Sequence, residues 1–173
     1  MAALLAGGSL AAQAQSSDAP ADTHWRFGIQ AGNVQDHQRS EPSARVSLGY
    51  DIDRTWTVEA LIELGLAFER DGGLADGERL FDDAAGVRVL ATLPLGERWN
   101  LVGGLGIVRA EYDVGYQSPQ LLDFYRHSVR QTTPMVSLAA MYKLGRRWSL
   151  GLEASSFTRE STFNLGLRGE FHF

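Results

Sequence analysis

The chain has 173 residues and no cysteine, and its formal net charge at pH 7 is −5. A chain of this length suits one domain, and without cysteine it has no disulfide framework, thiolate metal site or cysteine nucleophile. The acidic balance excludes a general nucleic-acid-binding protein, which would need a basic face, and beyond the N-terminus no apolar run approaches the roughly 18 residues of a transmembrane helix.

The N-terminal residues predict a targeting signal. Residues 2–12 are Ala, Leu and Gly with one Ser, and Ala12-Gln13-Ala14 fits the small-x-small pattern at which a secretory signal is cleaved. Residues 1–14 are therefore predicted to be a signal peptide that lacks the usual basic n-region, with a short buried helix as the alternative. The polar residues 15–23 are expected to form a flexible segment before a barrel domain over residues 24–173.

From residue 25 onward the sequence repeats one pattern, in which apolar residues alternate with polar or small ones until a turn follows. The predicted strands span residues 25–32, 44–51, 56–69, 85–93, 99–110, 136–144, 148–155 and 163–173. The third segment also fits a helix, because Glu59 and Glu63 would share one helical face. Its neighbours favour a strand.

An even number of strands of about ten residues is typical of a closed outer-membrane barrel, because closure pairs every backbone group and leaves no sheet edge in lipid. In the last segment Leu165, Leu167 and Phe171 share one face of a strand. Arg168 and Glu170 share the other face, which would line the lumen. The sequence therefore predicts an all-β fold, an eight-stranded antiparallel transmembrane β-barrel.

The predicted connections alternate in length. Residues 51–56, 95–99 and 144–148 form short turns, whereas residues 33–43, 70–77 and 114–133 form longer polar loops and residues 158–162 a short one. Short periplasmic turns and longer extracellular loops are typical of outer-membrane barrels. Aromatic residues beside the short turns are predicted to form a girdle at the membrane interface. These are Trp25, Tyr50, Trp56, Trp99, Tyr142, Trp148 and Phe173.

Charged residues of both signs fall on the predicted inner faces. The lumen of an eight-stranded barrel is just wide enough for side chains to fill it, and unpaired charges there would carry a large desolvation cost. We therefore expect a network of ion pairs and hydrogen bonds that seals the lumen; a gated ion path is the alternative. The expected members are Arg26, Arg45, Glu59, Glu63, Arg88, Lys143, Glu153, Arg168 and Glu170.

Signals for catalysis or metal binding are weak. His127 and Ser128 are adjacent, so in a strand they would point to opposite faces, and no carboxylate is clearly placed to orient the histidine. The four histidines are dispersed without metal-ligand spacing, and no cofactor is predicted. Four aspartates in the second long loop form either a solvated acidic surface or a site for divalent cations beside lipopolysaccharide. They are Asp71, Asp76, Asp82 and Asp83.

The longest predicted loop, residues 114–133, is the candidate for binding a partner. It carries Tyr116, Phe124, Tyr125 and Arg126, and aromatic residues with arginine on an exposed loop suit recognition of an extracellular protein or glycan. The alternative is that the strands extend beyond the membrane and these residues pack on one another.

Two stretches carry a resemblance to a known family. Residues 49–60, with the sequence Gly-Tyr-Asp-Ile-Asp-Arg-Thr-Trp-Thr-Val-Glu-Ala, and the ending over residues 164–173 look like those of the OmpA-like outer-membrane β-barrel family. The resemblance extends over residues 25–173 and implies a place in the outer membrane of a Gram-negative bacterium, among outer-membrane lipid and lipopolysaccharide. It also implies that Phe171 and Phe173 carry the signal read by the barrel-assembly machinery.

Taken together, these patterns predict a small outer-membrane barrel with a plugged lumen, which serves membrane structure and surface interaction and is not an enzyme. The first alternative is a narrow channel or a conduit for hydrophobic solutes of the OmpW type. The second is a lipid A-modifying enzyme of the PagL type.

Overall fold

The computed structural model describes residues 24–35, 40–66, 79–117, 124–158 and 162–173. The predicted signal peptide and the predicted flexible segment, residues 1–23 together, lie outside these ranges. In the part of the chain that is described, no helix has the length and apolar character needed to span a membrane.

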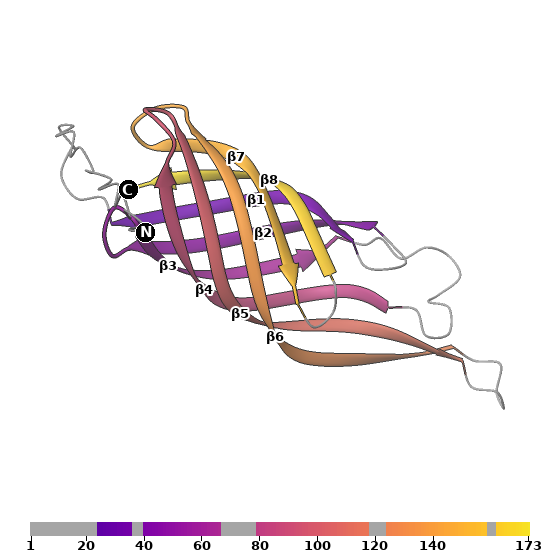
Figure 1. Cartoon of the computed structure of the whole chain (residues 1–173). Helices are drawn as coiled ribbons and strands as arrows, with labels where there is room; N and C mark the ends of the chain where they lie inside the picture. Colours follow the sequence, from indigo (N-terminus) through magenta and orange to yellow (C-terminus); the bar gives the residue numbers. More distant parts are fainter. Residues whose placement is uncertain (1–23, 36–39, 67–78, 118–123, 159–161) are drawn as a thin grey trace, which may run out of the picture.

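Eight antiparallel strands form a closed barrel, in which each strand pairs with the next and the last pairs with the first. The strands are β1 (Trp25–Gln35), β2 (Ser40–Asp51), β3 (Trp56–Gly65), β4 (Arg79–Pro94), β5 (Trp99–Gln117), β6 (Phe124–Lys143), β7 (Trp148–Phe157) and β8 (Thr162–His172). Figure 1 shows the strands winding obliquely around one axis. The predicted eight-stranded all-β barrel is confirmed.

Side chains alternate between the two sides of the barrel wall along each strand. Ile62, Leu105 and Leu167 point outward, and their exposed fractions are 57%, 69% and 58%. The charged residues between such positions point inward, and Glu63 and Arg168 expose only 0% and 2%. An apolar outer surface around a charged interior is the arrangement that lipid requires. The faces predicted from the period of two agree with this burial.

The predicted girdle residues lie at the end of the barrel that carries the short turns. Three ring pairs join neighbouring strands there: Trp25 with Tyr50 at 5.1 Å, Trp99 with Tyr142 at 5.0 Å and Trp148 with Phe171 at 4.7 Å. Trp56 begins β3 directly after the first turn, and the Phe173 N–H donates to the Trp25 carbonyl at 3.0 Å. The position of these aromatic residues at one end of the barrel is consistent with a girdle at the membrane interface. The girdle itself stays a prediction.

At the other end, the connections between β1 and β2 and between β5 and β6 are shorter than the sequence suggested. β4 begins at Arg79, β5 ends at Gln117 and β6 begins at Phe124, so the predicted loop over residues 114–133 is wrong. The alternation continues into this segment, because Ala110 and Tyr112 are buried, whereas Arg109 is exposed and Glu111 is partly exposed. Charged outward positions beyond the membrane gave the segment the composition of a loop.

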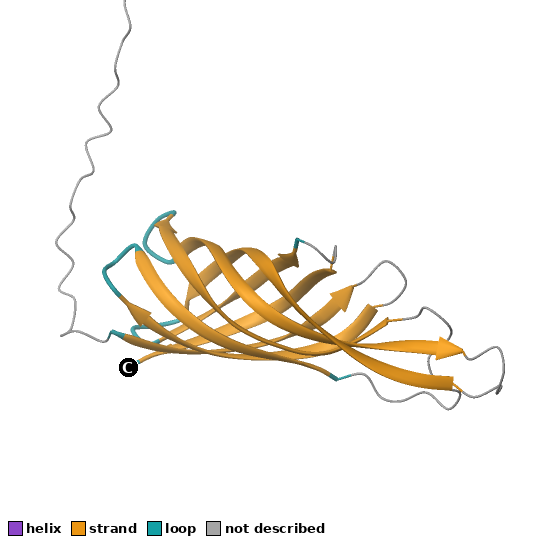
Figure 2. Ribbon diagram, turned by 90° about the horizontal axis from the view of Figure 1, so that it is seen from below, coloured by secondary structure: helices purple, strands orange, loops and turns teal. Residues whose placement is uncertain are grey.

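The longest strands form a sheet that projects beyond the rest of the barrel. The ladder between β6 and β7 begins only at Met135 and Phe157, although β6 starts at Phe124. β5 and β6 pair along their whole described length, to Gln117 and Phe124. Figure 2 shows this hairpin reaching well past the other strands, at the end opposite the short turns.

The last strand closes the barrel against β1, and we propose that its aromatic end is the assembly signal. Phe171 packs between the Trp148 ring at 4.7 Å and the Phe173 ring at 6.1 Å. It also lies opposite Phe27 in the β1 ladder. The contact with Trp148 requires β8 to meet β7, and the pairing with Phe27 requires β8 to meet β1, which ties both to the closing step.

Replacing Phe171 and Phe173 together by Ser is expected to lower the yield of folded barrel strongly, because the closing strand loses its lipid-facing aromatic contacts. Heat-modifiable migration in SDS gels measures that yield. Phe163→Ser is the matched control, since Phe163 is also an outward aromatic of β8, 42% exposed, but lies at the other end of the strand. Equal losses for the control and the double variant would contradict a signal at the C-terminal end.

Candidate functional site

The centre of the lumen is held by one carboxylate that three arginines share. Glu153 on β7 lies 2.5 Å from Arg45 Nη1, 2.6 Å from Arg88 Nη1 and 2.7 Å from Arg168 Nη1. The arginines come from β2, β4 and β8, so these contacts cross the lumen as well as joining neighbouring strands. All four side chains are at most 3% exposed.

Further carboxylates complete the pairing of the same arginines. Glu63 Oε2 lies 2.6 Å from Arg45 Nη2. Glu59 Oε1 lies 2.7 Å from Arg88 Nη2, and Glu59 also pairs with Arg168. The Arg168 Nε–H donates to Glu170 Oε1 at 2.8 Å. Each guanidinium therefore meets at least two carboxylates, which offsets the desolvation cost of burying it.

Of the nine charged residues that the sequence assigned to the lumen, eight are buried inside the barrel, whereas Lys143 is exposed. Lys143 ends β6 beside the third short turn and is exposed, and the ion pairs of the described residues do not reach it. The period of two gives the face of a residue but not its depth, so a rim position was mistaken for a central one. Arg26 does join the network, through Asp51 and through Glu170 at 3.8 Å.

Neutral and turn residues of the network were missed by sequence reasoning. Asp51, expected in a turn, accepts hydrogen bonds from Arg26 and from the Thr57 hydroxyl. The Arg45 Nη2–H donates to the Ser155 hydroxyl at 2.9 Å, and the Asn164 amide donates to Glu63. All of these residues occupy inward positions of their strands, and this position was the signal from which the sequence could have identified them.

Glycines make room for the long arginine side chains. A Cβ at Gly49 would lie 2.7 Å from Arg26 Cγ, and one at Gly106 would lie 2.5 Å from both Arg88 Cβ and the Val87 carbonyl oxygen. Real Cβ atoms do not approach so closely, so a larger residue at either inward position would displace an arginine. Glycine on the neighbouring strand therefore leaves the space that each of these arginines occupies.

An apolar layer covers the network towards the projecting sheet. The Phe81 ring lies 5.7 Å from the Tyr112 ring and 6.2 Å from the Phe157 ring. Val34 and Met135 belong to the same buried cluster, and all five are at most 5% exposed. The lumen is thus filled by charged groups in its middle and by packed apolar groups above them.

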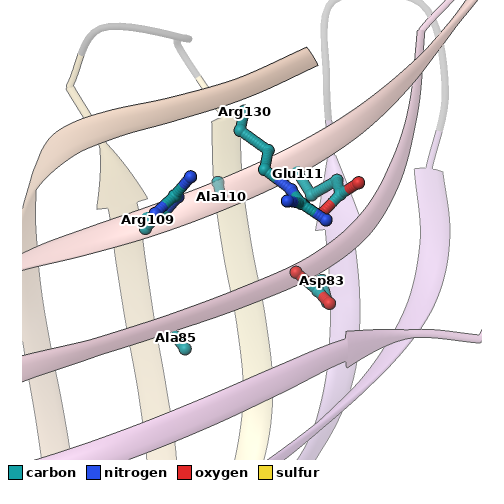
Figure 3. A pocket seen from close by; sticks show the side chains of 6 residues that line it. All are labelled: Asp83, Ala85, Arg109, Ala110, Glu111 and Arg130. Atoms are coloured by element: carbon teal, nitrogen blue, oxygen red, sulfur yellow. The ribbon is translucent and has the colours of Figure 1, made fainter. Parts of the chain in front are cut away.

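A small pocket lies on the outer face of the wall, at the base of the projecting sheet (Figure 3). Its volume is about 270 Å³, and its lining residues are Asp83, Ala85, Arg109, Ala110, Glu111 and Arg130. Arg130 Nε–H donates to Glu111 Oε2 at 2.6 Å, and the Ser128 hydroxyl donates to the same carboxylate. The hydrogen bond from Arg130 lowers the pKa of Glu111 most, and the hydrogen bond from Ser128 lowers it further.

The opposite shift is found at Asp83, whose pKa is raised by partial burial and then by the negative charges of Asp82 and Glu111. Asp82 and Asp83 were expected in a loop; they lie in β4 instead, where the register shifts between Phe81 and Asp83. Asp71 and Asp76 lie outside the described residues. Among the described residues no three His, Cys, Asp or Glu side chains are grouped to hold a metal ion.

His127 and Ser128, the weak catalytic signal of the sequence, and the predicted recognition residues fall on the projecting hairpin. His127 lies opposite Val114 and Ser128 opposite Asp113 in the β5–β6 ladder. Adjacent residues of one strand point to opposite faces, and Ser128 is bonded to Glu111 rather than to a histidine. The recognition candidates Tyr116, Phe124, Tyr125 and Arg126 lie in the same ladder, where Tyr116 faces Tyr125; their side chains lie outside the described part.

The chain is similar to known proteins in sequence and in structure. The sequence model of the family described as outer membrane protein beta-barrel domain matches residues 1–171. No curated protein matches the sequence.

Solved structures of the same architecture share little sequence with the chain. Ail, the attachment invasion locus protein of Yersinia pestis, is 12% identical with a TM-score of 0.57, and the match covers 86% of this chain and 95% of that one. The N-terminal β-barrel domain of Pseudomonas aeruginosa OprF is 10% identical with a TM-score of 0.56, covering 86% and 97%. Neisserial surface protein A is 10% identical with a TM-score of 0.56, covering 86% and 96%. Such identities show a shared fold.

Glu153→Gln is expected to lower the free energy of unfolding by about 3–5 kcal/mol, because it removes the negative charge that three buried guanidinium groups share. Unfolding by urea in lipid vesicles, followed by tryptophan fluorescence, measures the change. Glu97→Gln is the control, since Glu97 is an exposed glutamate of a short turn, and its midpoint should not move. Equal midpoints for the two variants would show that the network does not stabilise the barrel.

Proposed function

The chain belongs to the outer membrane protein beta-barrel domain family, and we propose that it acts at the cell surface while its lumen stays closed. It is a bacterial outer-membrane protein, as the family description and the barrel together establish. The observation that carries the proposal is the position of Glu153, which ties β7 to arginines of β2, β4 and β8 across the middle of the lumen. A path for ions or solutes would have to separate these charges.

The alternatives fit the lumen less well. A conduit for hydrophobic solutes needs an apolar path, whereas the middle of this lumen is lined by buried arginine and glutamate side chains. A narrow ion channel needs mobile water beside the charges, whereas each of the three central arginines has at least two carboxylate partners. A plug is the arrangement that leaves these pairs intact.

We also propose that the protein has no catalytic role. A lipid A deacylase would need a nucleophile activated by a neighbouring base. The Ser128 hydroxyl donates to Glu111, which in turn is held by Arg130. This carboxylate is engaged by two donors, and its lowered pKa makes it a weak base. His127 projects from the other face of β6, away from the serine.

The projecting β5–β6 hairpin is the surface on which we place partner binding. It extends beyond the neighbouring strands, and its tip carries Tyr116, Phe124, Tyr125 and Arg126, residue types suited to a protein or glycan partner. One solved structure of Ail is a complex with the heparin analogue sucrose octasulfate; it is 13% identical to this chain with a TM-score of 0.55. A sulfated glycan is therefore a suitable first probe.

Wild-type protein in planar bilayers is expected to show almost no sustained current, because the ion pairs fill the lumen. Glu63→Ala should open a leak, since Arg45 then loses one of its two carboxylates and draws water into the lumen. Arg147→Ala, in a short turn outside the lumen, is the control and should stay silent. Large, ion-selective wild-type conductance that Glu63→Ala leaves unchanged would exclude the plug and favour the channel.

Replacing Tyr125 and Arg126 by Ser is expected to reduce binding of vesicles containing the protein to immobilised heparin by tenfold or more. The reason is that aromatic and arginine side chains supply most of the binding energy at such surfaces. Arg54→Ser, in a periplasmic turn, is the control for net charge. If both variants bind like the wild type, the hairpin tip is not a glycan site and a protein partner is to be sought.

A further inference from the structure

The outer-wall pocket lies at the depth where the outer leaflet ends. Arg109 follows the girdle residue Trp99 by ten positions along β5. A transmembrane strand tilted by about 45° crosses the hydrocarbon core in roughly 9–11 residues, so Arg109 reaches the interface opposite the girdle. The outward residues just before it, Leu105 and Ile107, are 69% and 58% exposed and face lipid. The pocket therefore opens sideways, at the level of the lipid headgroups.

The pocket combines a fixed ion pair with a second arginine beside it. Glu111 holds Arg130 through a 2.6 Å hydrogen bond and orients its guanidinium along the wall. Arg109 is exposed on the same outer face, and within the described part of the chain no ion pair occupies it. Ala85, an exposed residue with a small side chain, and the buried Ala110 also line the space. Figure 3 shows Arg109 and Arg130 on either side of Ala110.

This arrangement suits a phosphorylated sugar. Arginine binds phosphate through parallel N–H···O bonds, and the outward edges of Arg109 and Arg130 offer such donors. Carboxylates accept hydrogen bonds from sugar hydroxyls, and Asp83 lies opposite Glu111 in the β4–β5 ladder to do so. The volume of about 270 Å³ leaves room for part of a headgroup, not for acyl chains.

We propose that this pocket binds the phosphorylated glucosamine headgroup of lipopolysaccharide, with Arg109 and Arg130 on the phosphate and Asp83 on a sugar hydroxyl. A membrane lipid is favoured over a soluble glycan because the pocket faces sideways from the lipid-contacting wall, directly above its apolar band. The site is distinct from the hairpin tip and does not depend on whether the lumen conducts.

The test compares lipids and variants on the whole folded chain. Wild-type protein refolded in detergent micelles is titrated with lipopolysaccharide, with the same lipid after enzymatic dephosphorylation and with phosphatidylglycerol, and bound lipid is counted by native mass spectrometry. Arg109→Gln is expected to weaken lipopolysaccharide binding about tenfold, equivalent to about 1.4 kcal/mol. Arg98→Gln removes the same charge from an exposed arginine at the opposite rim and should leave this binding unchanged. Heat-modifiable migration confirms that each variant is folded.

Several results would overturn the proposal. Equal binding of phosphorylated and dephosphorylated lipid would remove the role of the phosphate. Equal losses for Arg109→Gln and Arg98→Gln would show a general effect of net charge. Binding of soluble glucosamine phosphate that matches the intact lipid, competes with it and is lost in Arg109→Gln would assign the pocket to a soluble ligand instead of a membrane lipid.

Discussion

Closure of the sheet is the constraint on which the rest of this structure depends. In lipid no water satisfies an unpaired backbone group, so β8 must return to β1 and complete the ladder. Closure fixes the lumen at a width that side chains fill. Every second residue of every strand must then point into one narrow space. The inner residues have to suit one another across the barrel as well as along it.

The charged network meets this demand and also fixes how the strands align. A buried ion pair adds little net stability over an apolar core, because desolvation cancels much of the attraction. Its specificity is the greater effect, since a slip of β7 by one residue would turn Glu153 towards lipid and bring Leu152 into the lumen. That slip would leave three arginines without their shared carboxylate. The network therefore penalises the misaligned barrels that an all-apolar interior would tolerate.

The period of two made most of the fold and of the lumen predictable from the sequence. It gave the strands, their faces and the charged residues that meet inside, because a side chain's face follows from its parity alone. It gave neither the depth of a residue nor its partner, so Lys143 was placed in the centre and Asp51 was left out of the network. It also failed where the membrane ends, since charged outward residues such as Arg109 alternate in a strand just as they would occur in a loop.

The two ends of the barrel differ in how far their strands extend beyond it. At the girdle end, the described turns return the chain within a few residues. At the other end, β5 continues from Arg109 to Gln117, which at about 3.3 Å per residue carries the hairpin tip roughly 26 Å further along the strand. A headgroup held by Arg109 and Arg130 would brace β5 and β6 against the membrane surface, so that the same two strands carry a lipid site below and a partner surface above.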